Sequence, residues 1–350
     1  MFVPTSVPVA LLMSIGAVIG WSAQANCLVN LDMTPGVYHF DFIIWRTLWC
    51  FVLMLLFGMR WCPPNNDDSF ENIRNLFFAP TKELWTHIAG VTIAGITDML
   101  FQVFLFSGID GGGLSNTVPL QIGIGTLFGT FFTWLVDRRA NLVFFIPGVI
   151  LNLLAVVFDA LTYHFLNKDN AKKNEQNLLE TGEPEKPRLS TTQTVLICAT
   201  GALMGIPFGP GTAMAGREPY ALSPYSLTFL FSLVGLLTAP LFSYLLMRFP
   251  FQGPKSSFKD WWNLTWRQRW PAIWGALSWA LGTVAYNLAG PSLGYAVAFV
   301  IGQSNPFISS LFALFYWHEF RNAGAKTWVC EVCMLLLYAS SIGLIGLTLN

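Results

Sequence analysis

Two stretches of equal length decide the fold. Residues 108–139 read GIDGGGLSNTVPLQIGIGTLFGTFFTWLVDRR, and residues 290–321 read GPSLGYAVAFVIGQSNPFISSLFALFYWHEFR. Each contains a mainly apolar run of about 20 residues, the length that an α-helix needs to cross a bilayer core of roughly 30 Å. Each also carries a glutamine within this run and ends in an acidic residue that arginine follows two positions later. The two stretches therefore predict two membrane helices that correspond to each other.

The correspondence indicates an internal repeat. A shift of 182 residues aligns the two stretches without a gap, and it pairs Gly108 with Gly290, Gly112 with Gly294, Gln121 with Gln303, Asp137 with Glu319 and Arg139 with Arg321. A slightly different shift places residues 16–20 over residues 201–205. Paired glycines are weak evidence in apolar sequence, whereas the paired glutamine and the acid-x-Arg pattern are stronger. Such repeats are common in transporters.

The composition places the whole chain in a membrane. Of its 350 residues, 54% are hydrophobic and only 11% are charged, whereas roughly a quarter of the residues of soluble proteins are charged. Because a bilayer offers no partner to an unpaired backbone group, apolar runs of this length are expected to be helices. Ten runs are long enough, and they lie near residues 6–26, 38–59, 84–107, 113–135, 142–164, 192–216, 223–248, 271–290, 293–317 and 327–348. The sequence predicts an all-α polytopic membrane protein.

One strongly polar segment divides the chain. Residues 166–192 carry both acidic and basic side chains and little to bury, which is typical of a flexible linker. It separates a first five-span repeat, residues 1–165, from a second five-span repeat, residues 193–350. Because each half has an odd number of spans, equivalent helices cross the membrane in opposite directions. The predicted organisation is therefore two inverted five-helix repeats, as in many secondary transporters.

Several classes of function lack their usual signals. The formal net charge is zero, so nothing points to nucleic-acid binding. The six cysteines are scattered, and the sequence has no H-E-x-x-H, G-x-S-x-G or Walker A motif. We therefore expect neither an enzyme nor a resident cofactor or metal. The oligomeric state is not indicated.

Polar residues inside the spans are the best candidates for a site, because they are costly in lipid and tend to face the bundle interior. Gln121 and Gln303 lie beside glycines and prolines that can loosen a helix. An amide both donates and accepts hydrogen bonds to a neutral solute. Asn287 is a further candidate for substrate binding. The alternative reading is that these amides join neighbouring helices.

The carboxylate of Asp98 lies deep in its span and needs a partner or a proton. Gln102 follows one turn later on the same face. Asp98 is thus a candidate for proton coupling, with Gln102 as a binding or structural neighbour. Asp41 and Arg46 open the second span and are expected to form a structural ion pair. Trp21 in the first span could stack on a flat ligand, although interfacial packing is also expected of tryptophan.

The chain resembles the drug/metabolite transporter superfamily, and within it the ureide permease family and its sugar-porter-like relatives. The resemblance is carried by Gly20-Trp21, Phe40-Asp41-Phe42, the stretch 118–137 and above all the stretch that ends in Phe315-Tyr316-Trp317-His318-Glu319-Phe320-Arg321. It implies proton-coupled uptake, by symport, of uracil, allantoin or a related heterocycle. The sugar-porter relatives imply a carbohydrate instead.

We therefore expect a secondary transporter that works by alternating access around a site formed by spans 1, 3, 4, 6, 8 and 9. Its partners would be a small polar metabolite, the lipid bilayer and protons. A multi-pass protein of this kind is placed in the plasma membrane by default. A membrane scaffold or receptor that transports nothing is the alternative from another class.

Overall fold

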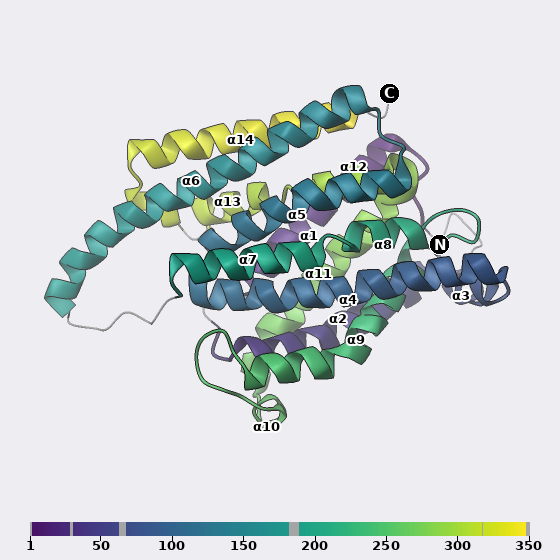
Figure 1. The fold of residues 1–350 in the computed structure, drawn as a ribbon, viewed down its shortest axis with the longest axis horizontal. Helices are drawn as coiled ribbons and strands as arrows, with labels where there is room; N and C mark the ends of the chain where they lie inside the picture. The colour runs from purple at the N-terminus through teal and green to yellow at the C-terminus, as the bar shows by residue number, and fades with distance from the viewer. Residues whose placement is uncertain (1, 29–30, 63–67, 182–188, 317, 348–350) are drawn as a thin grey trace.

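The computed structural model describes residues 2–28, 31–62, 68–181, 189–316 and 318–347, and every regular element within these ranges is helical. The elements are α1 (Val7–Asn26), α2 (Pro35–Phe57), α3 (Ser69–Phe77), α4 (Thr81–Gly112), α5 (Leu114–Asp137), α6 (Leu142–Thr181), α7 (Thr191–Gly205), α8 (Phe208–Ala215), α9 (Pro224–Arg248), α10 (Phe258–Trp262), α11 (Trp266–Leu293), α12 (Tyr295–Gly302), α13 (Asn305–Phe315), η1 (Glu319–Asn322) and α14 (Ala325–Gly346). The long helices run roughly side by side in one bundle (Figure 1).

Nine membrane spans are identified by length and apolar composition within the described residues, which confirms the prediction of an all-α polytopic membrane protein. Two of these spans are built from helix pairs, α7 with α8 and α12 with α13. The helix α11 is 28 residues long but less apolar than the nine. Because α11 packs against α1 and α2 inside the same bundle, we interpret it as the tenth expected span.

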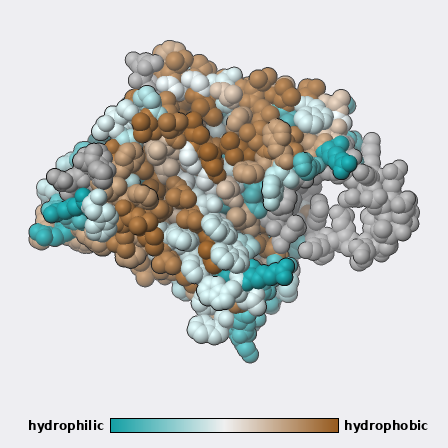
Figure 2. Space-filling model, turned by 180° about the vertical axis from the view of Figure 1, so that it is seen from behind, coloured by the Kyte–Doolittle hydropathy of each residue, from teal (hydrophilic) through white to brown (hydrophobic). Residues whose placement is uncertain are grey.

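The surface of the bundle is suited to lipid. Large apolar side chains such as Leu237 and Val143 are 74% and 73% exposed. The face seen in Figure 2 is broadly hydrophobic, and hydrophilic residues lie mainly towards its edges. Polar side chains are instead found inside, where Gln102, Gln121 and Asn287 are almost fully buried. This inversion of the soluble pattern is the arrangement expected where the solvent is a bilayer.

The helix contacts keep the same pattern when the two halves are exchanged. The helix α1 packs against α11, and correspondingly α7 and α8 pack against α4. The pairs α2 with α9, α5 with α12 and α6 with α14 each join a span to its own counterpart. A two-fold repeat predicts such contacts. The opposite orientation of the two halves in a membrane stays a prediction.

Two glycines mark the same turn in both halves. Gly113 joins α4 to α5 with a φ of 82°, and Gly294 joins α11 to α12 with a φ of 87°. Only glycine adopts such a φ without strain. The shift of 182 residues pairs Gly112 with Gly294, whereas the backbone conformation shows that Gly113 is the counterpart of Gly294.

Span 9 is interrupted where the sequence suggested. The helix α12 ends at Gly302, and α13 begins at Asn305, so Gln303 lies in the break. Pro306 in the first turn of α13 has no N–H with which to continue the preceding helix. Span 4 differs, because α5 passes through Pro119 without interruption.

The polar segment after span 5 is more regular than a flexible linker. The helix α6 continues to Thr181 and extends past its neighbours (Figure 1). Residues 166–181 contain no glycine or proline, whereas Gly182 and Pro184 follow at once. Since these two residue types are the strongest helix breakers, the sequence allows the helix up to this point. Residues 182–188 lie outside the described part of the chain.

Candidate functional site

A small cavity lies inside the bundle, between helices of both halves. Its volume is about 70 Å³, and it is bordered by α1, α4, α5, α7, α8, α11, α12, α13 and the break before α13. These elements correspond to spans 1, 3, 4, 6, 8 and 9. The lining residues are Trp21, Gln24, Ala25, Asp98, Phe101, Gln102, Leu105, Val118, Ile122, Gly125, Gly205, Phe208, Trp279, Phe299, Gln303 and Asn305.

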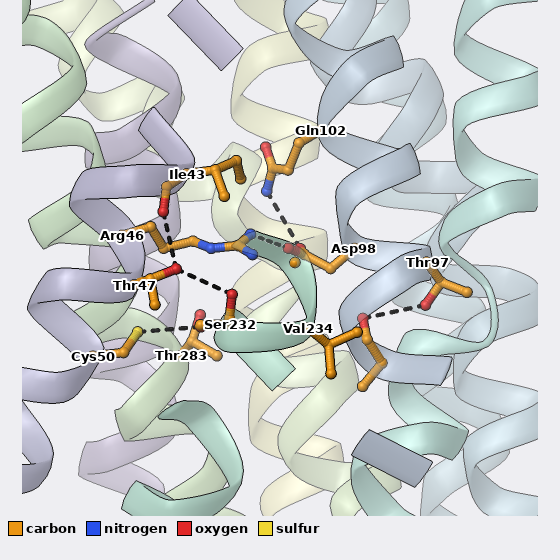
Figure 3. A network of polar contacts seen from close by, with 12 residues as sticks. Ile43, Arg46, Thr47, Cys50, Thr97, Asp98, Gln102, Ser232, Val234 and Thr283 are labelled. Carbon is orange, nitrogen blue, oxygen red and sulfur yellow. Dashed lines mark hydrogen bonds and ion pairs between the residues drawn. The ribbon is translucent and has the colours of Figure 1, made fainter. Parts of the chain in front are cut away.

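Aspartate 98 is held in an ion pair at the edge of this cavity. Arg46 of α2 donates from Nη1 to Oδ2 of Asp98, and the two side chains are 0% and 7% exposed. The guanidinium carbon of Arg46 lies 4.5 Å from the ring centroid of Trp279, within the range of a cation–π contact. Figure 3 shows the arginine reaching from α2 towards the aspartate on α4. The negative charge in the cavity wall is thereby compensated.

A chain of amides continues from this ion pair along the wall. Gln102 extends its Nε2 towards Oδ1 of Asp98 at 3.5 Å, as Figure 3 shows. The Oε1 of Gln102 accepts a hydrogen bond of 3.0 Å from Nε2 of Gln24 in α1. Gln102 uses both ends of its amide in this way and links span 3 to span 1. The ion pair, Gln102 and Gln24 therefore form one connected polar network beside the cavity.

The rest of the wall combines aromatic rings with a few polar atoms. Phe101, Phe208, Trp279 and Phe299 supply flat apolar surfaces. Trp21 also lines the cavity, and its Nε1 donates to Oγ1 of Thr283 at 2.9 Å, which fixes the ring. An apolar wall with a few placed polar groups is typical of small-molecule sites.

Near the helix break, Gln303 lines the cavity together with Asn305. The side-chain Oδ1 of Asn305 is buried and has no hydrogen-bond partner among the described residues. An unsatisfied buried acceptor is costly, so a donor on a bound solute or a water molecule would satisfy it. A ligand that donates a hydrogen bond at this end of the cavity would therefore stabilise the complex.

Two of the expected binding residues lie elsewhere. Gln121 is fully buried, and its Nε2 donates to the backbone oxygen of Phe101 at 2.9 Å, which joins α5 to α4. Asn287 donates to Oγ1 of Thr228 at 2.8 Å and joins α11 to α9. Neither side chain lines the cavity. Both fit the alternative reading, in which a membrane amide connects two helices.

The expected pair of Asp41 with Arg46 is wrong. Arg46 pairs with Asp98, whereas Asp41 pairs with Arg269 of α11 and accepts a hydrogen bond of 2.8 Å from Nε1 of Trp261. Five residues along an α-helix turn the side chain by roughly 140°, so the two residues face different neighbours. Each charge therefore meets a partner on another helix.

Sequence reasoning missed several residues of the cavity wall. Gln24 was visible as an amide inside span 1, by the same argument that selected Gln102. Apart from Trp21, the aromatic residues of the wall gave no such signal, because 15% of the chain is aromatic and most of these rings pack elsewhere. Within the described residues, no group of three or more His, Cys, Asp or Glu side chains could hold a metal ion.

The second half of the chain matches a known family. Residues 217–347 match the family model described as Ureide permease. Ureide permease 2 of Arabidopsis thaliana is 22% identical, and the alignment covers 95% of this chain and 94% of that protein. This chain is similar to the ureide permeases. Ureide permease 1 of the same plant is also 22% identical, over 77% of this chain and 80% of the relative.

These findings confirm the resemblance and point to a membrane transporter rather than an enzyme. A protein of known crystal structure shares the fold, with a TM-score of 0.54, 13% identity and coverage of 96% of this chain and 97% of that chain. At this identity the structural similarity shows the fold alone. The family model covers α9 to α14, so Trp21, Asp98 and Gln102 lie outside the matched residues.

Proposed function

We propose that this protein is a secondary transporter for a small, neutral, polar metabolite, namely a ureide or a nucleobase such as allantoin or uracil. The similarity to ureide permeases over nearly the whole chain supports the transport role. The observation that carries the choice of a neutral substrate is the cavity wall. Its charged side chain, Asp98, is compensated by Arg46, and the other lining residues are amides, aromatic rings and aliphatic groups.

Flat heterocycles with amide-like edges suit this wall. The rings of Trp21, Phe208 and Phe299 offer stacking surfaces, while Gln303 and Asn305 offer donors and acceptors. A charged substrate would leave an uncompensated charge in a buried site, which is strongly unfavourable. A carbohydrate also combines hydroxyl groups with faces that contact aromatic rings, so it remains the comparison substrate in the test.

Transport by alternating access requires the cavity to open in turn to each side. At about 70 Å³ it is smaller than the roughly 300–1,000 Å³ of typical ligand pockets. The helices around it must therefore move to admit a substrate. The two interrupted spans, α7–α8 and α12–α13, both reach the cavity and are the elements that we expect to bend.

Proton coupling would act through Asp98. Protonation of this carboxylate removes its charge and weakens its attachment to Arg46, while Gln102 and Gln24 connect it to α1. Binding of a proton to Asp98 would thereby change how α4 packs against α1 and α2. Asp98→Asn is expected to abolish the pH dependence of uptake.

The two paired glutamines should respond differently to the same substitution. Gln303→Ala should raise KM for uptake by about 3- to 10-fold, the effect of losing one hydrogen bond worth roughly 1 kcal/mol. Gln121→Ala is the matched control, because this residue corresponds to Gln303 but bonds to a helix backbone. It should lower the thermal stability and change KM less. The reverse pattern would contradict the proposed site.

The decisive measurement is uptake of radiolabelled uracil, allantoin and glucose by cells that express the wild type, Gln303→Ala or Asp98→Asn at pH 5.5 and 7.5. Surface expression of each variant is measured in parallel. Heterocycle uptake that depends on Gln303 supports the proposal. Uptake of glucose alone assigns the protein to carbohydrates, and no uptake by a surface-expressed wild type contradicts a role in transporting these substrates.

A further inference from the structure

A second polar site lies away from the cavity, between α6 and α14. These helices pack along each other in the bundle (Figure 1). They are antiparallel, because Ser341 near the end of α14 donates to the backbone oxygen of Gly148, whereas Thr327 near its start donates to Asp169. Along the seam, Ala155, Val156, Met334 and Tyr338 form an apolar cluster.

Two carboxyl groups are enclosed in this seam. Asp159 of α6 is 1% exposed and Glu331 of α14 is 0% exposed. The contacts of Gly148 with Ser341 and of Asp169 with Thr327 lie on either side of the two acids, so both belong to the same stretch of the seam. Both oxygens of Asp159 and Oε2 of Glu331 have no hydrogen-bond partner among the described residues, and Ser310 of α13 donates only to Oε1 of Glu331. Neither residue was singled out by the sequence.

Two further hydroxyl groups support a binding site rather than a packing accident. The hydroxyl of Tyr338 is fully buried, interacts electrostatically with Asp159 and has no partner in the described structure. The Oγ1 of Thr162, one turn after Asp159 on α6, is also buried and unpartnered. Unsatisfied buried polar groups are rare and indicate a missing ligand, ion or water molecule.

Among the described side chains of α6, α14 and the elements packed against them, the basic ones are exposed rather than buried beside these acids. The elements that pack against α6 or α14 are α5, α12, α13 and η1. Neither α12 nor α13 contains a charged residue, and Asp137 at the end of α5 pairs with Arg139. Four further titratable residues of these elements are exposed, namely His164, Lys168, Arg321 and Lys326. The others include Cys330 and Cys333, which flank Glu331 in the sequence, Tyr163 on α6 and Tyr295 on α12.

We propose that Asp159 and Glu331 form a proton-binding carboxyl pair that holds one proton between them at neutral pH. Two ionised carboxylates without a cation would repel each other in an apolar seam, and a shared proton removes one charge and supplies the missing donor. The pair joins the last span of each half, so proton occupancy controls how tightly α6 and α14 hold together.

This inference does not rest on the proposed transport function, so it is tested on the purified protein in detergent. Infrared spectroscopy at pH 7.5 detects the C=O stretch of a protonated carboxyl separately from that of a carboxylate. The wild type should show a protonated band that Asp159→Asn/Glu331→Gln loses. Asp169→Asn is the matched control, because Asp169 lies on the same helix but accepts from Gly324 and Thr327. It should keep the band.

Unfolding provides an independent measurement. The unfolded chain has released this proton by about pH 6, because ordinary carboxyls titrate near pH 4, whereas the folded wild type still holds it. Stability therefore falls as the pH rises. One proton held only by the folded state changes the unfolding equilibrium constant by at most tenfold for each pH unit. Between pH 6 and 8 this constant should therefore rise by up to about 100-fold more in the wild type than in the double variant. The proposal is overturned if the wild type and the double variant show the same pH dependence of unfolding, or if the double variant keeps the infrared band. It is also overturned if both carboxyls are ionised and the stability depends on sodium.

Discussion

Asp98→Ala is expected to lower the free energy of unfolding by about 3–5 kcal/mol, because it leaves the guanidinium of Arg46 buried without its counter-charge. Arg46 is fully buried, and its Nε and Nη2 already lack hydrogen-bond partners among the described residues. Its contact with the Trp279 ring replaces only part of the lost attraction. The measurement is unfolding in detergent micelles, followed by tryptophan fluorescence.

Two controls separate a buried ion pair from a general effect of charge. Glu71→Ala breaks the pair of Arg60 with Glu71, whose side chains are 62% and 47% exposed, and should leave the stability nearly unchanged because solvent screens this pair. Arg46→Met/Asp98→Leu removes both buried charges and should regain most of the lost stability. A double variant as unstable as Asp98→Ala would show that the pair is not the cause.

Gly20→Ala is the second large expected effect. A Cβ at Gly20 of α1 would lie 2.6 Å from both the Cα of Gly282 and the backbone oxygen of Ser278 in α11. Backbone atoms cannot rotate away, so the two helices must separate. We expect a loss of about 1–3 kcal/mol in stability, as for other overpacked sites. Because Trp21 and Trp279 on these helices both line the cavity, uptake should fall as well.

Gly16→Ala is the matched control for this crossing. Gly16 lies one turn earlier on α1, and a Cβ there would approach Cβ of Ala285 only to 3.5 Å, an ordinary van der Waals contact. The same substitution should therefore leave stability and uptake nearly unchanged. Both are measured by thermal unfolding and by the uptake assay. Equal effects at the two glycines would contradict a close crossing at Gly20.

The sequence predicts the membrane spans well, but it does not predict which partners the polar residues in these spans will have. Gln121 and Gln303 occupy equivalent positions in the repeat, yet Gln303 lines the cavity and Gln121 holds α5 to α4. The difference arises because the chain breaks between α12 and α13 but stays helical through α5. Local sequence suggested loosening at both places, and only packing decided which helix gives way.

By itself, the sequence determined that this is a polytopic helical membrane protein similar to the ureide permeases. The length and apolar character of each span are local properties, since a bilayer demands about 20 apolar residues whatever the neighbouring helices are. The tertiary structure alone decided that Arg46 meets Asp98 rather than Asp41, and that Asp159 and Glu331 are both buried in the seam between α6 and α14. Such partners lie on different helices, and their distance depends on how the helices rotate and cross.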